Sequence, residues 1–267
     1  MRNKKSVSLL MLTLAAHFAA ARLPAQVVPP NATGVSMGHL HLLVRDPAAH
    51  IKIWKDVVGA KAVRYGTLEA LELPGVILAF RKGEPTGGTD DSAVNHLGFL
   101  TRDLDKTKAE LVAAGCQIVK EMPATRQMFT MWPDNVKVEF SEDKTIEVPY
   151  KHHHIHFQSH QVEEQRAWYA KHFGAIPGKR LRFEAADLPG VNLSWNPADK
   201  PMLPTKGRSL DHIGFEIKGL KAFIAKLEAA GVKFDRPFTH VPQIGLDIAF
   251  FTDPWGAYVE LTEGLAR

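Results

Sequence analysis

Four histidines and two glutamates occupy repeated places in the sequence and could together bind a metal ion. The four histidines each open a short apolar run: His39, His96, His154 and His212. Glu139 and Glu260 each lie near the end of another such run. A single strand histidine is commonly a hydrogen-bonded core residue, but imidazole and carboxylate groups recurring at equivalent positions are suited to bind a divalent metal. Because Cys116 is the only cysteine, a disulfide framework and a thiolate metal cluster are excluded.

The spacing of these residues shows that the chain is duplicated. His154 follows His39 by 115 residues, and His212 follows His96 by 116 residues. Glu260 follows Glu139 by 121 residues, because the last hairpin has five additional residues around positions 240–245. A repeat of this length indicates that one structural unit occurs more than once.

The repeated residues must be positioned by four similar units, which we call modules one to four. Each module reads as a strand opened by its histidine, a helix, and three short strands. The helices are expected over residues 48–58, 104–114, 162–173 and 220–230. Each is followed by a glycine suited to end a helix: Gly59, Gly115, Gly174 and Gly231.

With these motifs, residues 35–264 resemble the βαβββ modules of the vicinal oxygen chelate superfamily, which includes glyoxalases, bleomycin-resistance proteins and extradiol dioxygenases. The most specific part of this resemblance is Asp253-Pro-Trp-Gly followed by Glu260 and Leu261. The resemblance implies an α+β fold in which the modules pair into two cup-shaped mixed sheets with helices outside. We expect a first glyoxalase-like domain over residues 34–147 (modules one and two) and a second over residues 148–267 (modules three and four).

In this family the metal ligands come from the first and last strands of the modules. The first-strand ligands would be the four histidines above, and the last-strand positions are Ala79, Glu139, Ser194 and Glu260. Pairing modules in sequence order gives two ligand sets: His39, His96 and Glu139, then His154, His212 and Glu260. Two histidines and one carboxylate form the facial arrangement of non-haem Fe(II) oxygenases. Ala79 and Ser194 depart from the four-ligand glyoxalase pattern.

The resemblance implies a metal-dependent enzyme acting on a small-molecule substrate with neighbouring oxygens, and the ligand set favours dioxygenase-like chemistry with Fe2+. Zn2+, Mn2+, Ni2+ or Co2+ suit the same ligands. A glyoxalase-type lyase or isomerase, or a non-catalytic binding protein of the bleomycin-resistance type, remains an alternative.

Three further residues are candidates for catalysis: His156, His240 and Tyr258. His156, like His41, lies two residues beyond a presumed ligand and shares its strand face, where it either relays protons or lines the cup. The family's extradiol enzymes have a histidine and a tyrosine before the last turn, but here Phe250 replaces the tyrosine and His240 is displaced by one residue.

We expect the second half of the chain to be catalytic, because it has more groups that can relay protons. In the first half, Lys137 would replace or repel a cation.

Residues 1–25 read as a secretory signal peptide, with a basic start, a short apolar run and a small-residue end. Its removal would take away four basic residues and no acid, so the net charge would fall from +4 to zero. The basic balance therefore does not indicate nucleic-acid binding. We expect an exported protein, periplasmic or extracellular, that is not membrane-bound after cleavage and is a monomer or homodimer.

Overall fold

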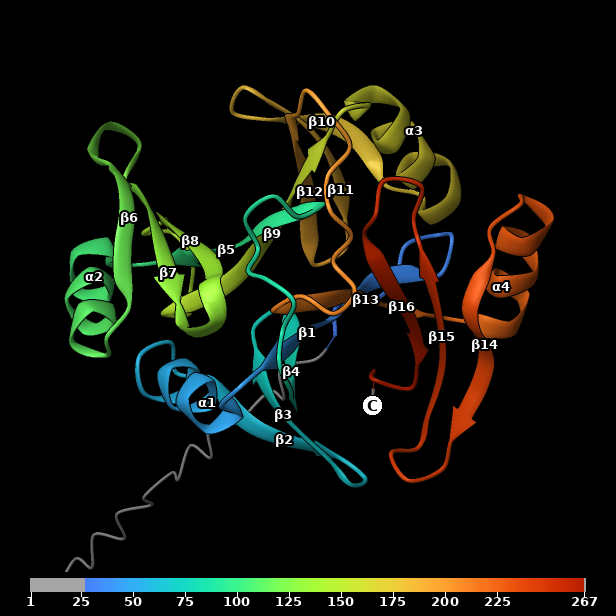
Figure 1. Ribbon diagram of the computed structural model, residues 1–267, viewed down its shortest axis with the longest axis horizontal. Coiled ribbons are helices and arrows are strands. Elements are labelled where there is room, and N and C mark those ends of the chain that lie inside the picture. Colours follow the sequence, from blue (N-terminus) through green and yellow to red (C-terminus); the bar gives the residue numbers. More distant parts are fainter. Residues whose placement is uncertain (1–26, 267) are drawn as a thin grey trace, which may run out of the picture.

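The computed structural model describes residues 27–266, in which all four expected modules are present (Figure 1). The predicted signal peptide lies outside the described residues. The elements of the first two modules are β1 (Val35–Val44), α1 (Pro47–Asp56), β2 (Lys61–Tyr65), β3 (Leu68–Leu73) and β4 (Val76–Lys82), then β5 (Val94–Thr101), α2 (Leu104–Ala113), β6 (Gln117–Met122), β7 (Gln127–Trp132) and β8 (Val136–Glu142). Those of the last two are β9 (Tyr150–Ser159), α3 (Val162–Phe173), β10 (Ile176–Arg180), β11 (Phe183–Leu188) and β12 (Val191–Pro197), then β13 (Leu210–Ile217), α4 (Leu220–Ala229), β14 (Phe234–Val241), β15 (Leu246–Thr252) and β16 (Tyr258–Glu263).

The predicted α+β class and module order are confirmed. The glycines expected to end the helices, at 59, 115, 174 and 231, all have positive φ, between 69° and 89°. This left-handed conformation costs glycine little and ends a helix by turning the chain. No helix among the described residues is long and apolar enough to span a membrane.

The pairing of the modules differs from the expectation of neighbouring pairs. The first eight-stranded sheet has the order β14-β15-β16-β13-β1-β4-β3-β2, so it joins modules one and four. The second has the order β10-β11-β12-β9-β5-β8-β7-β6 and joins modules two and three. Each sheet therefore contains strands from both halves of the chain, and neither half forms a cup by itself.

The connections between modules account for this pairing. Only seven residues, 143–149, separate β8 from β9, and β9 returns antiparallel beside β5. The longer segments after modules one and three cross between the sheets and pair with each other through a bridge between Ser92 and Leu203. The amide of Ala93 donates to the carbonyl of Leu203, and that of Leu203 donates to the carbonyl of Asp91, each at 2.9 Å.

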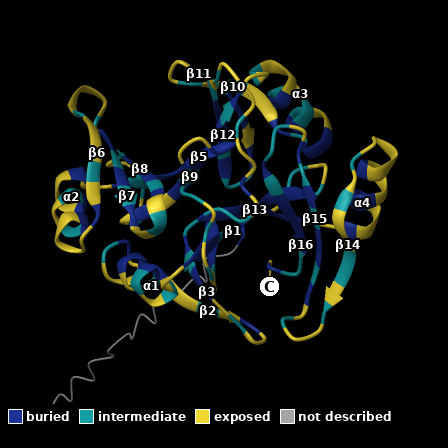
Figure 2. Cartoon of the chain, viewed as in Figure 1, coloured by how far each residue is buried: buried dark blue, intermediate teal, exposed yellow. Residues whose placement is uncertain are grey.

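A continuous apolar core holds the two sheets together (Figure 2). Trp54 of α1 lies 4.4 Å from Trp132 of β7 between ring centroids, which joins modules one and two. Phe173 of α3 lies 5.1 Å from Phe215 of β13, which joins modules three and four. Helices α1 and α3 thus contact strands of the neighbouring sheet, and the open faces of the cups remain for the polar clusters.

Candidate metal sites

Two clusters of histidine and glutamate lie on the seams between first strands, one in each sheet. Site A contains His39, His41, His212 and Glu260, and site B contains His96, His154, His156 and Glu139. In each cluster one ligand atom from every residue lies within 4.8 Å of the others. The predicted ligands are therefore all brought together, but their grouping in sequence order is wrong, because β1 pairs with β13 and β5 pairs with β9.

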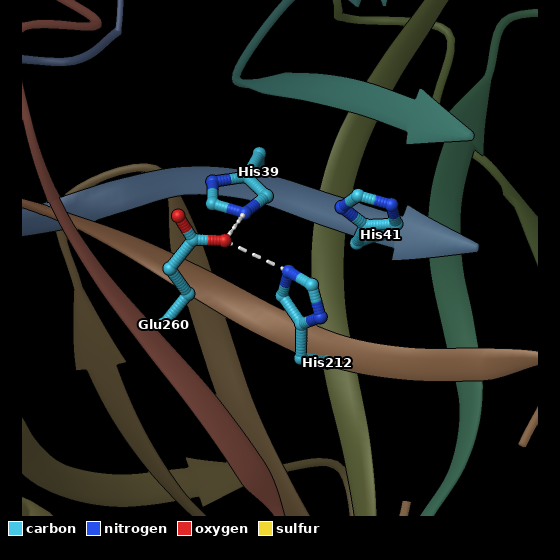
Figure 3. Close-up of side chains that lie close together, drawn as sticks. All are labelled: His39, His41, His212 and Glu260. Atoms are coloured by element: carbon cyan, nitrogen blue, oxygen red, sulfur yellow. Dashed lines mark hydrogen bonds and ion pairs between the residues drawn. The ribbon is translucent and has the colours of Figure 1, made fainter. Parts of the chain in front are cut away.

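In site A, two imidazoles converge on one carboxylate oxygen (Figure 3). Glu260 Oε2 lies 3.0 Å from His39 Nε2 and 2.8 Å from His212 Nε2. Burial raises the pKa of Glu260, but the two histidines outweigh it, and the pKa lies below its usual range. The carboxylate is therefore ionised at neutral pH and suited to a cation.

A second carboxylate orients His212. Asp211 Oδ1 lies 2.7 Å from His212 Nδ1. Burial lowers the pKa of His212, but Asp211 and Glu260 more than offset it and raise the pKa. A carboxylate on the far ring nitrogen fixes the tautomer and makes the near nitrogen a stronger metal ligand.

A glycine makes room for one first-strand histidine in each cluster. Gly214 lies opposite His39 in the β1–β13 register, and a Cβ at Gly214 would overlap the His39 ring. Gly98 stands in the same relation to His154 across β5 and β9. These close approaches hold the rings over their seams. The convergent donors, Asp211 and the space left by Gly214 show that site A fits a divalent metal.

The wall of site A is mainly apolar. Ala79 takes the fourth-ligand place on β4 and lies opposite His41. The cavity over the site has a volume of about 240 Å³, and its apolar lining includes Ile77, Ile248 and Phe250. His41 faces it with a buried Nε2 that has no hydrogen-bond partner within residues 27–266. Burial first, then His212 and His39, lowers the pKa of His41 to about 3, so this imidazole is neutral at pH 7.

Site B has a similar triad of two histidines and one glutamate, with different neighbours. Glu139 Oε2 lies 3.0 Å from His96 Nε2 and 3.3 Å from His154 Nε2. Its other oxygen accepts hydrogen bonds from Gln127 Nε2 and Ser141 Oγ, both at 2.9 Å. The neutral Asn95 contacts His96 Nδ1 at 2.9 Å, where site A has Asp211. Burial lowers the pKa of His96 despite its contact with Glu139.

A guanidinium also enters site B. Arg180 Nη2 lies 3.1 Å from His154 Nε2 and 3.8 Å from Glu139 Oε2. Sequence patterns did not identify Arg180, because the residue 115 positions earlier is Tyr65. They also missed Asp211 and Asn95, although each directly precedes a ligand histidine and could have been found from that position.

The residues predicted to be catalytic do not share one site. His156 belongs to site B, where its ring centroid lies 4.5 Å from that of His96. Tyr258 lies beside site A, stacked on Phe250 and 5.9 Å from His212 between ring centroids. His240 is exposed on β14, where its Nδ1 lies 2.6 Å from Asp247 Oδ1. The structure therefore divides the expected second-half machinery between two cups and leaves His240 outside both clusters.

Comparison with solved structures shows the same fold. A V278E mutant of glyoxalase I from Zea mays has a TM-score of 0.67 at 19% identity, over 86% of this chain and 92% of that chain. A putative dioxygenase from Bacillus subtilis subsp. subtilis str. 168 has a TM-score of 0.62 at 14% identity, over 86% of each chain. No curated protein matches the sequence.

The family model of the glyoxalase/bleomycin resistance protein/dioxygenase superfamily matches residues 36–140 and again residues 151–261. The two matches follow the two halves of the sequence repeat, and together they cover most of the chain. The modules, the paired sheets and the His/Glu clusters agree with this match, and the chain belongs to this superfamily of vicinal oxygen chelate proteins.

Proposed function

We propose that site A is the catalytic centre of a metal-dependent, dioxygenase-like enzyme that acts on a small substrate with two neighbouring oxygens. The observation that carries the proposal is the convergence of His39, His212 and Glu260 in a cavity where Ala79 takes the fourth-ligand place. Three protein ligands leave open positions for a substrate and a second small molecule. A four-ligand glyoxalase-type site is less consistent with Ala79.

The residues of site A suggest how such a substrate would be held. A divalent ion bound there would polarise substrate oxygens, and Fe2+ would in addition support chemistry with O2. The apolar lining excludes water and favours a substrate whose body is apolar. His41 Nε2, buried and facing the cavity, is placed to accept a hydrogen bond from a substrate hydroxyl.

The test is to purify the protein lacking residues 1–25, measure its metal content, and load it with Fe2+ without oxygen. Oxygen uptake is then followed with a panel of catechols, and isomer or lyase products are followed with 2-oxoaldehydes. We expect Fe2+-dependent oxygen uptake that is lost in His212→Ala. Turnover of 2-oxoaldehydes but not of catechols would favour a glyoxalase-type lyase. Protein that holds no metal and binds these compounds without converting them would favour the non-catalytic binding protein.

We also infer that the protein is exported to the periplasm or beyond. This inference is supported by the basic start, short apolar run and small-residue end of residues 1–25.

A further inference from the structure

We propose that site B binds a small organic anion in place of a metal ion, with the Arg180 guanidinium as its built-in cation. This inference goes beyond the proposed function, because it concerns the other cup. It follows from the atoms that Arg180 contacts, from the charges around the two triads, and from the lining of the cavity above site B.

Arg180 uses the atoms that a metal ion would need. It is the last residue of β10, and its side chain is 11% exposed. Its Nη2 faces His154 Nε2 at 3.1 Å and Glu139 Oε2 at 3.8 Å, and its Nε donates to Ser194 Oγ at 2.9 Å. A guanidinium keeps its charge in proteins, so a divalent ion on this triad would stand beside a permanent positive charge.

Site A lacks such a cation at the equivalent position. Tyr65 ends β2 as Arg180 ends β10, and its neutral hydroxyl donates to the carbonyl of Leu265 at 3.4 Å. Site A also has two carboxylates, Glu260 and Asp211, and Asp211 has an exposed Arg81 3.6 Å away. Site B has the single carboxylate Glu139, whose charge Arg180 balances. The two triads are thus alike in ligands and opposite in their fitness for a divalent cation.

The cavity above site B has an excess of positive charge. Its volume is about 410 Å³, and four basic residues and one carboxylate line it: Lys120, Lys137, Arg180, Arg182 and Glu139. Lys137 is paired with Asp90 outside the cavity lining. Within the described residues, Lys120 and Arg182 have no carboxylate partner. These two charges favour a ligand that carries a negative charge.

The other lining residues indicate the shape of that ligand. Phe129 and Phe183 contribute aromatic walls, and Phe183 lies 4.8 Å from His156 between ring centroids. Arg182 lies over the Phe183 ring, 4.7 Å from its centroid. A carboxylate with a flat apolar body would place its charge at the arginines and its body between the rings.

The first test counts Co2+ ions bound per chain at equilibrium. We expect Arg180→Ala to bind one ion more than wild type, because it frees His96, His154 and Glu139. Arg180→Met keeps the apolar stem and should gain the same ion. The matched control Lys179→Ala, on the same strand but outside the cavity lining, should keep the wild-type count. Two ions in wild type, or equal counts in wild type and both Arg180 variants, would overturn the proposal. Because the readout is the difference between variants, it stands apart from any failure of site A.

The second test titrates the metal-free mature chain, in buffer with EDTA, with benzoate and with the neutral benzamide. We expect benzoate to bind at least about tenfold more tightly than benzamide, and Arg180→Met to lose at least about tenfold in benzoate affinity. His212→Ala, in the other cup, should bind benzoate as wild type does. Equal affinity for both probes, no binding of benzoate, or unchanged binding in Arg180→Met would overturn the assignment.

Discussion

His41 and His212 lie directly opposite each other on the antiparallel seam between β1 and β13, with ring centroids 4.5 Å apart, although they come from opposite ends of the chain. His156 and His96 have the same relation across β9 and β5, also at 4.5 Å. Each candidate site is therefore assembled from both halves of the sequence repeat. A substitution in one half should affect the cup that it shares with the other half.

The shared cups lead to a first prediction about metal binding. His39→Ala and His212→Ala should remove the same ion, so combining them should cause no further loss of metal. His96→Ala should keep that ion, because His96 lies in the other sheet. The test is to measure the metal content of the three single variants and of the double variant after dialysis. Loss of the ion in His96→Ala with retention in His212→Ala would instead support grouping by sequence halves.

Asp211→Asn should weaken metal binding at site A by about 10–100-fold, the usual cost of losing such a supporting carboxylate. The amide can still accept from His212 Nδ1, as Asn95 does in site B, but it removes the charge that raises the pKa of His212. Competition with a metal-binding dye measures the affinity. The exposed Asp56→Asn on α1 is the control, and an equal affinity in both variants would contradict the role given to Asp211.

Gly214→Ala should disturb site A, because the added methyl would overlap the His39 ring. We expect a loss of about 1–3 kcal/mol in the free energy of unfolding, together with weaker metal binding. Gly178→Ala on β10 is the matched control, since a Cβ there would have no neighbour within 4 Å among the described residues. Urea unfolding and metal titration of both variants provide the test. If Gly214→Ala matched Gly178→Ala in stability and in metal affinity, the strand would have to move to admit the methyl.

The module order and the histidines and glutamates of the two clusters could be predicted from the sequence, because they depend on local patterns. Strand alternation places residues 39 and 41 on one face, and the repeat identifies the same pair at 154 and 156. The pairing of modules could not be predicted in this way. All four first strands have similar patterns, so either arrangement satisfies them, and the short link of residues 143–149 and the paired crossing segments decide between them.

Arg180 and His240 show two other limits of sequence reasoning. Arg180 enters site B from the end of a hairpin strand, and the repeat gives no signal because Tyr65 occupies the equivalent place. As a catalytic candidate, His240 would have to reach the site from the enlarged last hairpin. Its partner across β14 and β15 is Asp247, which lies beside it in the register and pairs with it at the surface.

Export remains a prediction from residues 1–25. The mature protein should begin near Arg22 or Gln26 and should be recovered from the cell envelope or the medium. Sequencing its N-terminus after expression of the full chain tests this. Soluble cytoplasmic protein that retains Met1 would contradict export.

A final prediction concerns Asp253, the first residue of the Asp-Pro-Trp-Gly turn, which joins this turn to α3. Its Oδ1 accepts hydrogen bonds from the amides of Trp255 and Ala257, and its Oδ2 accepts them from Tyr169 Oη and Gln165 Nε2. Burial raises the pKa of Asp253 from 3.8 to about 6 despite these donors.

A carboxyl whose pKa is raised on folding contributes stability that is fully present below pH 3.8 and is lost as the pH rises through 6. We therefore expect the wild type to lose stability relative to Asp253→Asn between pH 4 and pH 6. The difference between their free energies of unfolding should fall by up to about 1.4 kcal/mol per pH unit. The amide is neutral at every pH and still offers an oxygen to the two backbone donors, so the variant should fold. Urea unfolding at a series of pH values measures the difference, with the exposed Asp199→Asn as the control. A difference for Asp253→Asn that does not change with pH would show that Asp253 is already ionised throughout this range.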